Sequence, residues 1–239
     1  MGEKLIIQEG KSYLVRDTEK DFHTKDGFLT AKQLGSKAGS IVETNKGVSF
    51  SLADPQFIDR YQRIKRQPQI IPRKDVALII AETGLGKDSV VVDAGTGSGA
   101  LACFLAHIVK KVVSYEIRED FADVAEKNIS MLDIKNCTVK RKSIYDGISE
   151  KNVDCITLDL PEPWKAVEHA ADSLKPGGFL VSYSPTIPQV MDFAQRLSRF
   201  YHIKTAELIE REWDVHDRKV RPKSAGIGHS GFLTFARLR

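Results

Sequence analysis

A glycine-rich turn stands between an apolar run and a segment of helical period. It reads DAGTGSGA over residues 93–100. Glycine has no Cβ, so the backbone can turn sharply there and come close to a bound molecule. Such a turn between a strand and a helix is typical of nucleotide-binding folds. The residues expected to bind a nucleotide-like cofactor are Asp93, Gly95, Thr96, Gly97, Ser98 and Gly99.

Two acidic residues further along the chain could complete an adenosine site. Glu116 ends the apolar run KVVSYE, about twenty residues after the turn, where a carboxylate can accept both ribose hydroxyls. Asp146, in YDGI, closes a later unit and could accept a hydrogen bond from the adenine amino group, although a plain turn explains it as well.

The spacing of the glycines separates two cofactor classes. A pyrophosphate fingerprint is GxGxxG, whereas Ala100 and Leu101 leave GxGxG here. The carboxylate of Asp93 would repel a pyrophosphate but suits a cationic sulfonium ligand. The pattern therefore favours S-adenosylmethionine over a nicotinamide dinucleotide.

The segment LDLPEPW, residues 158–164, follows a later apolar run. Asp159 ends this run, and ligands bind at the carboxyl ends of strands in open α/β sheets. Pro161 and Pro163 stiffen the loop, which could hold a base edge at Asp159 and stack a ring on Trp164. An ordinary proline-rich turn is the alternative.

Basic residues gather in two stretches although the net charge is only +4. Residues 60–74 contain six basic and no acidic side chains, and residues 217–223 contain four basic ones. Such clusters could meet the phosphates of a nucleic acid, or form a solvated basic face. The candidate contacts are Arg63, Arg66, Arg218, Lys219 and Arg221.

The composition of the 239 residues is that of a globular protein, with 41% hydrophobic and 28% charged residues. No apolar run reaches the roughly 18 residues needed to span a membrane, and no signal peptide is visible, so we expect a cytoplasmic protein. Three cysteines without CxxC spacing predict small buried side chains rather than a metal site or disulfides.

The elements that must hold these residues fall into two parts. Residues 1–60 show short apolar runs with turn signals at Glu9-Gly10 and Asp26-Gly27, which predict a small β-rich N-terminal domain. Residues 61–239 alternate strands and helices, among them a helix from Pro188 to Phe200 and a strand over 203–212. This alternation predicts an α/β fold with a doubly wound, mainly parallel sheet.

Four longer stretches carry a family resemblance. DAGTGSGALA, YEIREDFADVAEKN, the run from DLPEPW through LKPGGFLVSYSPTIPQV, and GHSGFLTFAR follow one another in the right order within residues 60–239. Together they resemble the class I tRNA (adenine-58-N1) methyltransferases of archaea and bacteria, the TrmI family. The resemblance implies a seven-stranded Rossmann-like sheet, S-adenosylmethionine as methyl donor, N1 of adenine 58 in the T-loop of tRNA as acceptor, adenine 57 as a further candidate acceptor, and a homotetramer.

The resemblance also implies roles for single residues. Gln69 to Ile71 border the cofactor, Asp159 lies between cofactor and target base, and Tyr183 lies near the flipped adenine. For Tyr183 the alternative is a core residue with a satisfied hydroxyl. Pro72 departs from the pattern, because many relatives have tyrosine there. With an ordinary carboxyl pKa near 3.9, Asp159 would act by hydrogen bonding and charge rather than by full deprotonation. His229 is expected to make a local hydrogen bond rather than a substrate contact.

Other functions share parts of these signals. A class I methyltransferase acting on a protein or a small molecule would keep the glycine turn. A non-catalytic tRNA-binding subunit would be expected to lose it. A nicotinamide dehydrogenase is disfavoured by the missing third glycine.

Overall fold

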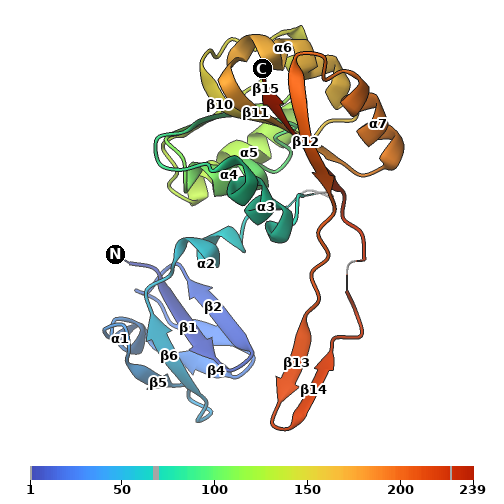
Figure 1. Ribbon diagram of the computed structural model, residues 1–239. Helices are drawn as coiled ribbons and strands as arrows, with labels where there is room; N and C mark the ends of the chain where they lie inside the picture. The colour runs from blue at the N-terminus through green and yellow to red at the C-terminus, as the bar shows by residue number, and fades with distance from the viewer. Residues whose placement is uncertain (1, 67–69, 227) are drawn as a thin grey trace. The chain divides into compact units, whose positions relative to one another are not determined.

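The computed structural model describes residues 2–66, 70–226 and 228–239. The chain forms two compact units, Met1–Ile64 and Lys65–Arg239. Both can be followed in Figure 1, the first in blue and the second from green to red. Each unit has its own buried core, so each is described by itself.

The first unit is built from short antiparallel strands. Its main sheet has the order β2-β1-β6-β5. The predicted turn at Glu9-Gly10 is confirmed, and the hairpin predicted around Asp26-Gly27 is also present, although Lys25 and Asp26 connect its strands and Gly27 already begins the second strand. A core around Leu29 and Phe50 holds the unit together. The elements are β1 (Lys4–Gln8), β2 (Lys11–Val15), β3 (Phe22–Thr24), β4 (Gly27–Leu29), α1 (Ala31–Leu34), β5 (Ile41–Glu43), β6 (Ser49–Ala53) and α2 (Phe57–Tyr61).

The second unit is centred on a seven-stranded sheet in the order β12-β15-β11-β10-β7-β8-β9. All neighbours from β11 to β9 are parallel, and only β15 runs antiparallel to β11 and β12. The predicted mainly parallel, doubly wound sheet is therefore confirmed. The strands are β7 (Val90–Ala94), β8 (Lys111–Tyr115), β9 (Cys137–Lys140), β10 (Val153–Leu158), β11 (Leu174–Ser184), β12 (Phe200–Ala206) and β15 (Phe232–Leu238).

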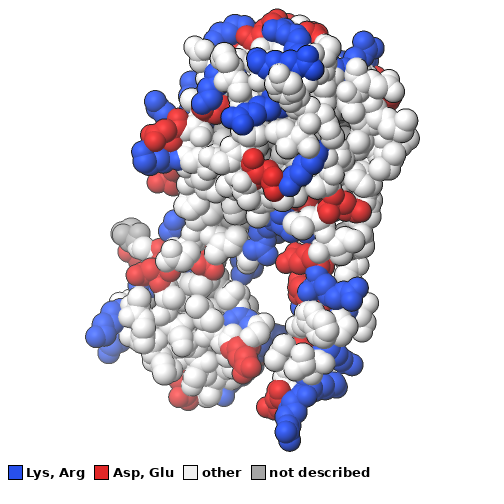
Figure 2. Space-filling model, viewed as in Figure 1, with Lys and Arg blue, Asp and Glu red and all other residues white. Residues whose placement is uncertain are grey.

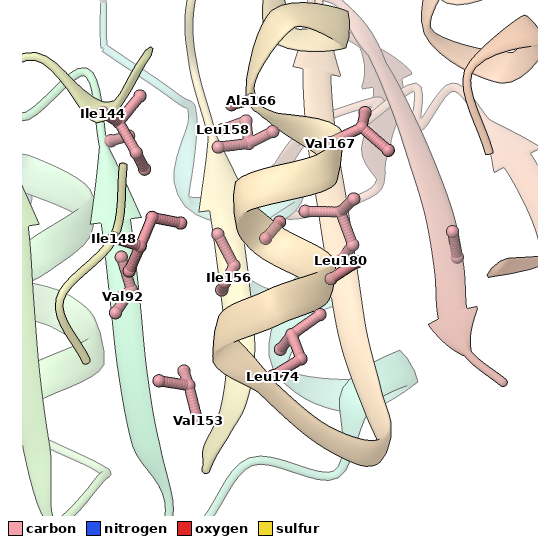
Figure 3. Close-up of a cluster of buried hydrophobic side chains, with 14 of the residues drawn as sticks. Val92, Ile144, Ile148, Val153, Ile156, Leu158, Ala166, Val167, Leu174 and Leu180 are labelled. Carbon is pink, nitrogen blue, oxygen red and sulfur yellow. The ribbon is translucent and has the colours of Figure 1, made fainter. Parts of the chain in front are cut away.

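Helices cover both faces of this sheet. Val91 packs in a cluster with residues of α3 and α4, while Val92 packs in another with residues of α6. Figure 3 shows the second cluster, with Ile156 and Leu180 on neighbouring strands beneath α6. Burial on both faces explains why these strands are continuous apolar runs. The helices are α3 (Arg73–Thr83), α4 (Ala100–Ala106), α5 (Glu119–Met131), α6 (Val167–Ser173) and α7 (Ile187–Gln195), with 3₁₀ turns η1 (Ile144–Asp146) and η2 (Pro163–Ala166).

Two predicted boundaries near the C-terminus are wrong. The helix expected to reach Phe200 ends at Gln195, and the late strand occupies Phe200–Ala206. The hairpin of β13 (Trp213–His216) and β14 (Lys219–Pro222) was not predicted. The sequence carries two signals for this hairpin. Trp213 and Val215 alternate with polar residues, and Asp217, which has a φ of 49° in the structure, is a residue type that turns favour. Both signals are weak because every residue of this hairpin is exposed, so no buried face imposes a pattern.

The topology marks where a ligand should bind. The chain leaves β7 toward β8 and β9, then returns to place β10 on the other side of β7. Ligands of open α/β sheets bind beyond the carboxyl ends of the strands at such a reversal. Within the described ranges, no helix is long and apolar enough to cross a membrane. In the same ranges, no cluster of His, Cys, Asp and Glu could hold a metal ion.

Candidate functional site

The glycine turn meets the loop after β10 at the strand reversal. The amide of Asp159 donates to the carbonyl of Ala94 at 2.9 Å. Gly95 has a φ of 87°, and a Cβ added there would lie 1.9 Å from the carbonyl oxygen of Asp159. No side chain fits in that space. Glycine at 95 therefore lets the two loops that carry the predicted site residues come together.

Glu116 fixes the same turn from β8. Its Oε2 accepts from the amide of Gly97 at 2.9 Å, and its Oε1 accepts from the amides of Ile117 and Arg118 at 2.9 and 3.0 Å. The side chain is 7% exposed. A carboxylate has about four acceptor positions, so Glu116 keeps acceptor capacity for ligand hydroxyls while it holds the turn.

The start of α4 contains an unsatisfied polar atom. Ser98 Oγ is buried and has no hydrogen-bond partner among the residues that the structure describes, while the Ser98 carbonyl accepts from the Asn128 amide at 2.8 Å. Gly99, with a φ of 76°, brings this turn close to α5, because a Cβ there would lie 3.1 Å from that of Ala125. Buried polar atoms normally have partners, so the lone hydroxyl points to a ligand that completes the turn.

Asp93 lies inside the sheet rather than at its surface. Its carboxylate, 1% exposed, accepts from Ser114 Oγ at 2.6 Å and from Thr157 Oγ1 at 2.8 Å. Thr96 Oγ1 lies 2.6 Å from Ser114 Oγ, which extends the network into the glycine turn. Burial raises the pKa of Asp93. Asp93 thus joins three strands beneath the turn, and its attraction for a cationic ligand stays a prediction.

The expectation of an ordinary pKa for Asp159 is wrong. Burial, and secondarily the charge of Asp93, raise the pKa of Asp159 to about 7. A carboxyl group with this pKa is poised between its two protonation states at neutral pH. Because general bases work best with a pKa near the operating pH, deprotonation of a substrate group by Asp159 becomes feasible.

A cavity of about 740 Å³ lies beyond the ends of β8 and β9. Asp146 faces it, as does Ile117, whose side chain follows Glu116 and is 68% exposed. Ile117 was not among the predicted site residues, and its only signal in the sequence is its place directly after Glu116. The cavity is lined by Tyr115, Ile117, Arg141, Lys142, Ser143, Asp146, Gly147, Ile148 and Ser149.

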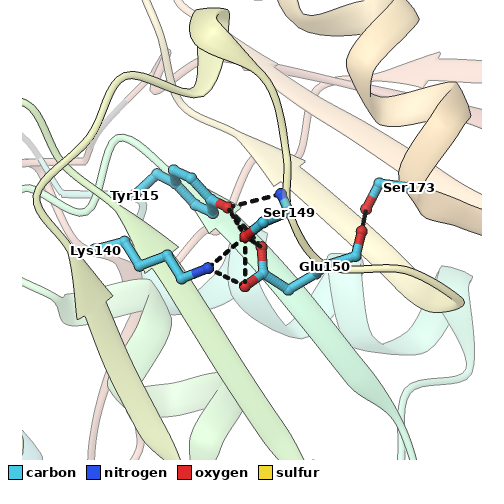
Figure 4. Close-up of polar contacts among 5 residues, drawn as sticks. All are labelled: Tyr115, Lys140, Ser149, Glu150 and Ser173. Carbon is cyan, nitrogen blue, oxygen red and sulfur yellow. Dashed lines mark hydrogen bonds and ion pairs between the residues drawn. The ribbon is translucent and has the colours of Figure 1, made fainter.

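A polar network braces one wall of this cavity (Figure 4). Glu150 accepts from the Tyr115 hydroxyl at 2.5 Å and pairs with Lys140. Lys140 also donates to Ser149 Oγ at 2.6 Å, and Ser173 donates to the Glu150 carbonyl at 2.7 Å. The loop that follows Asp146 is thereby tied to β8, β9 and α6.

The two aromatic candidates have different surroundings. Tyr183, on β11, is half-buried, and its hydroxyl donates to the carbonyl of Ser230. Burial raises the pKa of Tyr183 to about 12, and the charges of Asp75 and Asp159 act in the same direction. Leu158 pairs with Ser182 where β10 runs beside β11, so Asp159 and Tyr183, one residue further along each chain segment, lie side by side at the strand ends. Trp164 instead lines a separate hollow with Lys165, Val167, Glu168 and Arg196, and its stacking role stays a prediction.

The basic stretch 60–74 is only partly free for a ligand. Arg60 pairs with Glu3 at 2.5 Å, and Arg63 donates to the Ser12 carbonyl at 3.0 Å. Lys74 is buried in an ion pair with Asp75. The number of basic residues in this stretch of sequence therefore overstates the positive charge that is free to bind a ligand. Arg66 is exposed, as are Arg218, Lys219 and Arg221 on the β13–β14 hairpin, where Figure 2 shows basic side chains at the tip.

Three further residues bear on the sequence predictions. Gln69 lies outside the described residues. Asn128, which sequence reasoning missed, exchanges hydrogen bonds of 2.9 Å with both backbone groups of Lys65 and so ties the segment before Gln69 to the glycine turn. His229 makes the expected hydrogen bonds within the chain, with Nε2 2.9 Å from the Pro185 carbonyl and Nδ1 2.5 Å from Glu207.

The strand order, the glycine turn and the acid at the end of β8 define a Rossmann-like methyltransferase fold. A solved S-adenosylmethionine-dependent O-methyltransferase from Thermotoga maritima matches it with a TM-score of 0.88 and 29% identity, covering 99% of this chain and 92% of that one. The family described as the tRNA methyltransferase complex GCD14 subunit matches residues 61–226, and the chain belongs to that family.

Two curated relatives carry more specific names. The tRNA (adenine(57)-N(1)/adenine(58)-N(1))-methyltransferase TrmI of Methanocaldococcus jannaschii is 36% identical, over 98% of this chain and 94% of its own length. The tRNA (adenine(58)-N(1))-methyltransferase TrmI of Thermus thermophilus is 32% identical, over 96% of this chain and 94% of its own.

Proposed function

We propose that this chain transfers a methyl group from S-adenosylmethionine to N1 of adenine 58 in the T-loop of tRNA. The observation that carries the proposal is Asp159, which lies against the glycine turn, near Tyr183, with a pKa of about 7. The names of both relatives support the acceptor. Adenine 57 is a second acceptor to be tested, since only one of those names includes it.

The chain contains groups that fit the cofactor. The turn at Gly95 admits a close approach, Ser98 Oγ lacks a partner within the described ranges, and Asp146 and Ile117 face a cavity next to Glu116. In this proposal Glu116 accepts from the ribose hydroxyls and Asp146 from the adenine amino group. When bound, S-adenosylmethionine supplies an electrophilic methyl group on a cationic sulfur.

Asp159 acts on the target base. Methylation of N1 places positive charge on the adenine ring, and a nearby carboxylate stabilises that charge as it develops. Asp159 accepts a hydrogen bond from the exocyclic amino group, and its raised pKa also allows it to take a proton from that group. The main contribution of the protein is to align the methyl group with N1 of the base. Such alignment can lower the activation free energy by roughly 7–11 kcal/mol at most.

The target must leave the folded T-loop before it can reach Asp159. Extruding a nucleotide costs a few kcal/mol, and contact with an aromatic ring can return about 1–3 kcal/mol. Tyr183 presents a half-buried ring at the end of the strand beside Asp159, where the extruded base can stack. Because its hydroxyl is held by Ser230, the ring is fixed before the base arrives.

The test uses unmodified tRNA transcript, S-adenosylmethionine labelled at the methyl group, and nucleoside analysis. We expect label in 1-methyladenosine, and none when adenine 58 is replaced by guanine; a second transcript lacking adenine 57 tests that site. Label in protein or in a small molecule but not in tRNA would favour the other acceptor classes. Absence of S-adenosylmethionine binding by calorimetry would favour a non-catalytic tRNA-binding subunit.

Binding of the methyl donor should release protons near neutral pH. With a pKa of about 7, Asp159 is about half protonated at pH 7 in the free protein. A cationic ligand favours the ionised form, so binding should release up to about half a proton at pH 7 and less at pH 9. Calorimetry in buffers of different protonation enthalpy measures this release.

Two controls assign the protons. S-adenosylhomocysteine has no sulfonium charge and should release fewer protons at the same pH. The Asp159→Asn variant should release almost none. Equal release by the variant and the unsubstituted protein would show that other groups titrate and that the pKa of Asp159 is not raised as stated.

The exposed basic residues are proposed to hold the tRNA backbone. The logarithm of tRNA affinity should fall linearly with the logarithm of salt concentration. Removing one phosphate-binding side chain should reduce the magnitude of that slope by about 0.7–0.9. Replacing Arg218, Lys219 and Arg221 together by alanine should therefore flatten the slope, as filter binding at several salt concentrations would measure. Lys87→Ala is the control, since that exposed side chain pairs with Asp88 in another loop. An unchanged slope in the triple variant would exclude the hairpin from tRNA binding.

Assembly and location are further parts of the proposal. The family resemblance supports a homotetramer. The β13–β14 hairpin exposes Trp213, Val215 and Val220 at 53%, 71% and 57%, and grouped exposed apolar side chains of this kind are typical of surfaces that another subunit covers. Light scattering at assay concentrations tests the mass. A tRNA-modifying enzyme of this kind would act in the cytoplasm.

A further inference from the structure

A buried ion pair lies outside the residues assigned to the reaction so far. Lys74 and Asp75 begin α3, and their side chains are 8% and 1% exposed. Lys74 Nζ lies 2.8 and 2.9 Å from the two carboxylate oxygens of Asp75. Buried pairs of this kind add little stability, because desolvation offsets their attraction. Stability alone therefore does not explain why two charged side chains occupy this buried position.

The pair reaches a turn 155 residues further along the chain. Lys74 Nζ donates to Ser230 Oγ at 2.7 Å, and Ser230 Oγ donates to Asp75 Oδ2 at 2.9 Å. The three side chains form a closed ring of hydrogen bonds, which we call the Lys74–Asp75–Ser230 triad. Each polar atom in it has a partner, so the geometry of the ring is well defined.

The turn held by the triad, residues 228–231, contacts the ring of Tyr183. The Ser230 carbonyl accepts from the Tyr183 hydroxyl. Gly231 packs so closely that a Cβ there would lie 2.5 Å from Cζ of Tyr183. The position of the phenol is therefore set by the backbone of the turn, and the position of the turn is set by the triad.

Two members of the triad lie close in sequence to the segment that is predicted to border the cofactor. Lys74 and Asp75 follow Ile71 after two residues, and Ile71 is buried in the cluster that includes residues of α3 and α4. The charge of Asp75 acts on Tyr183 together with that of Asp159. The triad thus joins the segment predicted to border the cofactor to the aromatic ring predicted to receive the base.

We propose that the Lys74–Asp75–Ser230 triad is a positioning device for methyl transfer. It holds the 228–231 turn, and through it the Tyr183 ring, in register with Asp159 while the target base is bound. The proposal rests on the proposed function. The triad touches neither reacting atom and acts only through Tyr183.

The test separates positioning from folding with two sets of variants. Ser230→Ala removes the hydroxyl and keeps the backbone carbonyl that binds Tyr183. At saturating S-adenosylmethionine and tRNA, its single-turnover rate constant should fall by about 10-fold or more, since a misplacement near 1 Å can cost about 100-fold. Affinity for S-adenosylmethionine should change little. Ser230→Thr keeps the hydroxyl and should recover most of the rate.

The second variant replaces the buried charges together, as Lys74→Met with Asp75→Leu and Ser230→Ala. Apolar replacement of a whole buried ion pair is often neutral for stability, whereas Lys74→Met alone would leave a buried carboxylate without a partner. The triple variant should unfold at the same denaturant concentration as the unsubstituted protein and still react slowly. If the triad were purely structural, its loss would instead lower the amplitude of the single turnover, which measures the fraction of active molecules. The rate constant would then stay unchanged.

The outcomes can be told apart. A stable triple variant with the rate constant of the unsubstituted enzyme would overturn the inference and leave the proposed function intact. Failure of the unsubstituted protein to methylate tRNA would instead overturn the proposed function. A slow triple variant of normal stability and normal affinity for S-adenosylmethionine would support positioning, and recovery in Ser230→Thr would assign it to the hydroxyl.

Discussion

Replacing Asp159 by alanine is expected to lower the single-turnover rate of tRNA methylation by about 100- to 1,000-fold, the decrease typical of removing one preorganised electrostatic group from a transition state. The carboxylate lies at the end of β10, against the glycine turn, where burial raises its pKa to about 7. Dissociation constants for tRNA and for S-adenosylmethionine should change much less than the rate. Rapid-quench assays with enzyme in excess measure the rate directly.

The pH dependence tests the same carboxylate. Because the pKa is raised, Asp159 is protonated below about pH 7, and the protonated form cannot stabilise a cationic ring. The single-turnover rate should therefore fall as pH decreases through the pKa of the enzyme–substrate complex, which lies below 7 when a cation is bound. Asp159→Asn should be slow and nearly independent of pH.

A matched control comes from the same loop. Glu162→Gln removes a carboxylate that is partly exposed and forms an ion pair with the neighbouring Lys165, at 2.5 Å. Exposed pairs of this kind contribute little, so this variant should retain nearly the full rate. Equal decreases in the Asp159 and Glu162 variants would mean that the loop, rather than the charge at 159, is what the reaction requires.

The parts of the fold that sequence predicts well are those in which one physical requirement dominates. Strands buried on both faces, such as β7 and β10, appear as apolar runs, and the glycine turn is visible because Gly95, Gly97 and Gly99 all have positive φ. The exposed β13–β14 hairpin has no such requirement and was missed. Local pattern also misplaced the end of α7, because Phe200 packs in the core as part of a strand.

The site shows a similar division. Residue types at strand ends indicated Glu116 and Asp159, but the environment of each was not visible in sequence. Burial changes the acid strength of Asp159, and Lys74 counts as a basic residue although it is enclosed in an ion pair. Both effects depend on groups brought together from distant parts of the chain. Asn128 was missed for the same reason, since its partners Lys65 and Ser98 lie 63 and 30 residues away.

The second large effect is expected from Gly95→Ala. The new methyl group would lie 1.9 Å from the carbonyl oxygen of Asp159, and the φ of 87° at residue 95 is one that alanine rarely adopts. Since neither backbone can yield without separating the ends of β7 and β10, the substitution should destabilise the protein by about 1–3 kcal/mol, the usual range for overpacking. Displacement of Asp159 and of the turn should also weaken S-adenosylmethionine binding and methylation by about 100-fold or more.

Two other glycines make this prediction specific. Gly86→Ala should be neutral, because a Cβ there meets nothing within 4 Å. Gly97 has a φ of 53°, but its Cβ would come only within 3.9 Å of the Gly95 carbonyl, so Gly97→Ala should cost about 1–2 kcal/mol of backbone strain without a collision. Calorimetry for binding and denaturant unfolding for stability should rank the defects as Gly95, then Gly97, then Gly86. Wild-type affinity in a folded Gly95→Ala protein would mean that the close approach of the two loops is not what forms the site, and Asp159 would then lose its place beside the methyl donor.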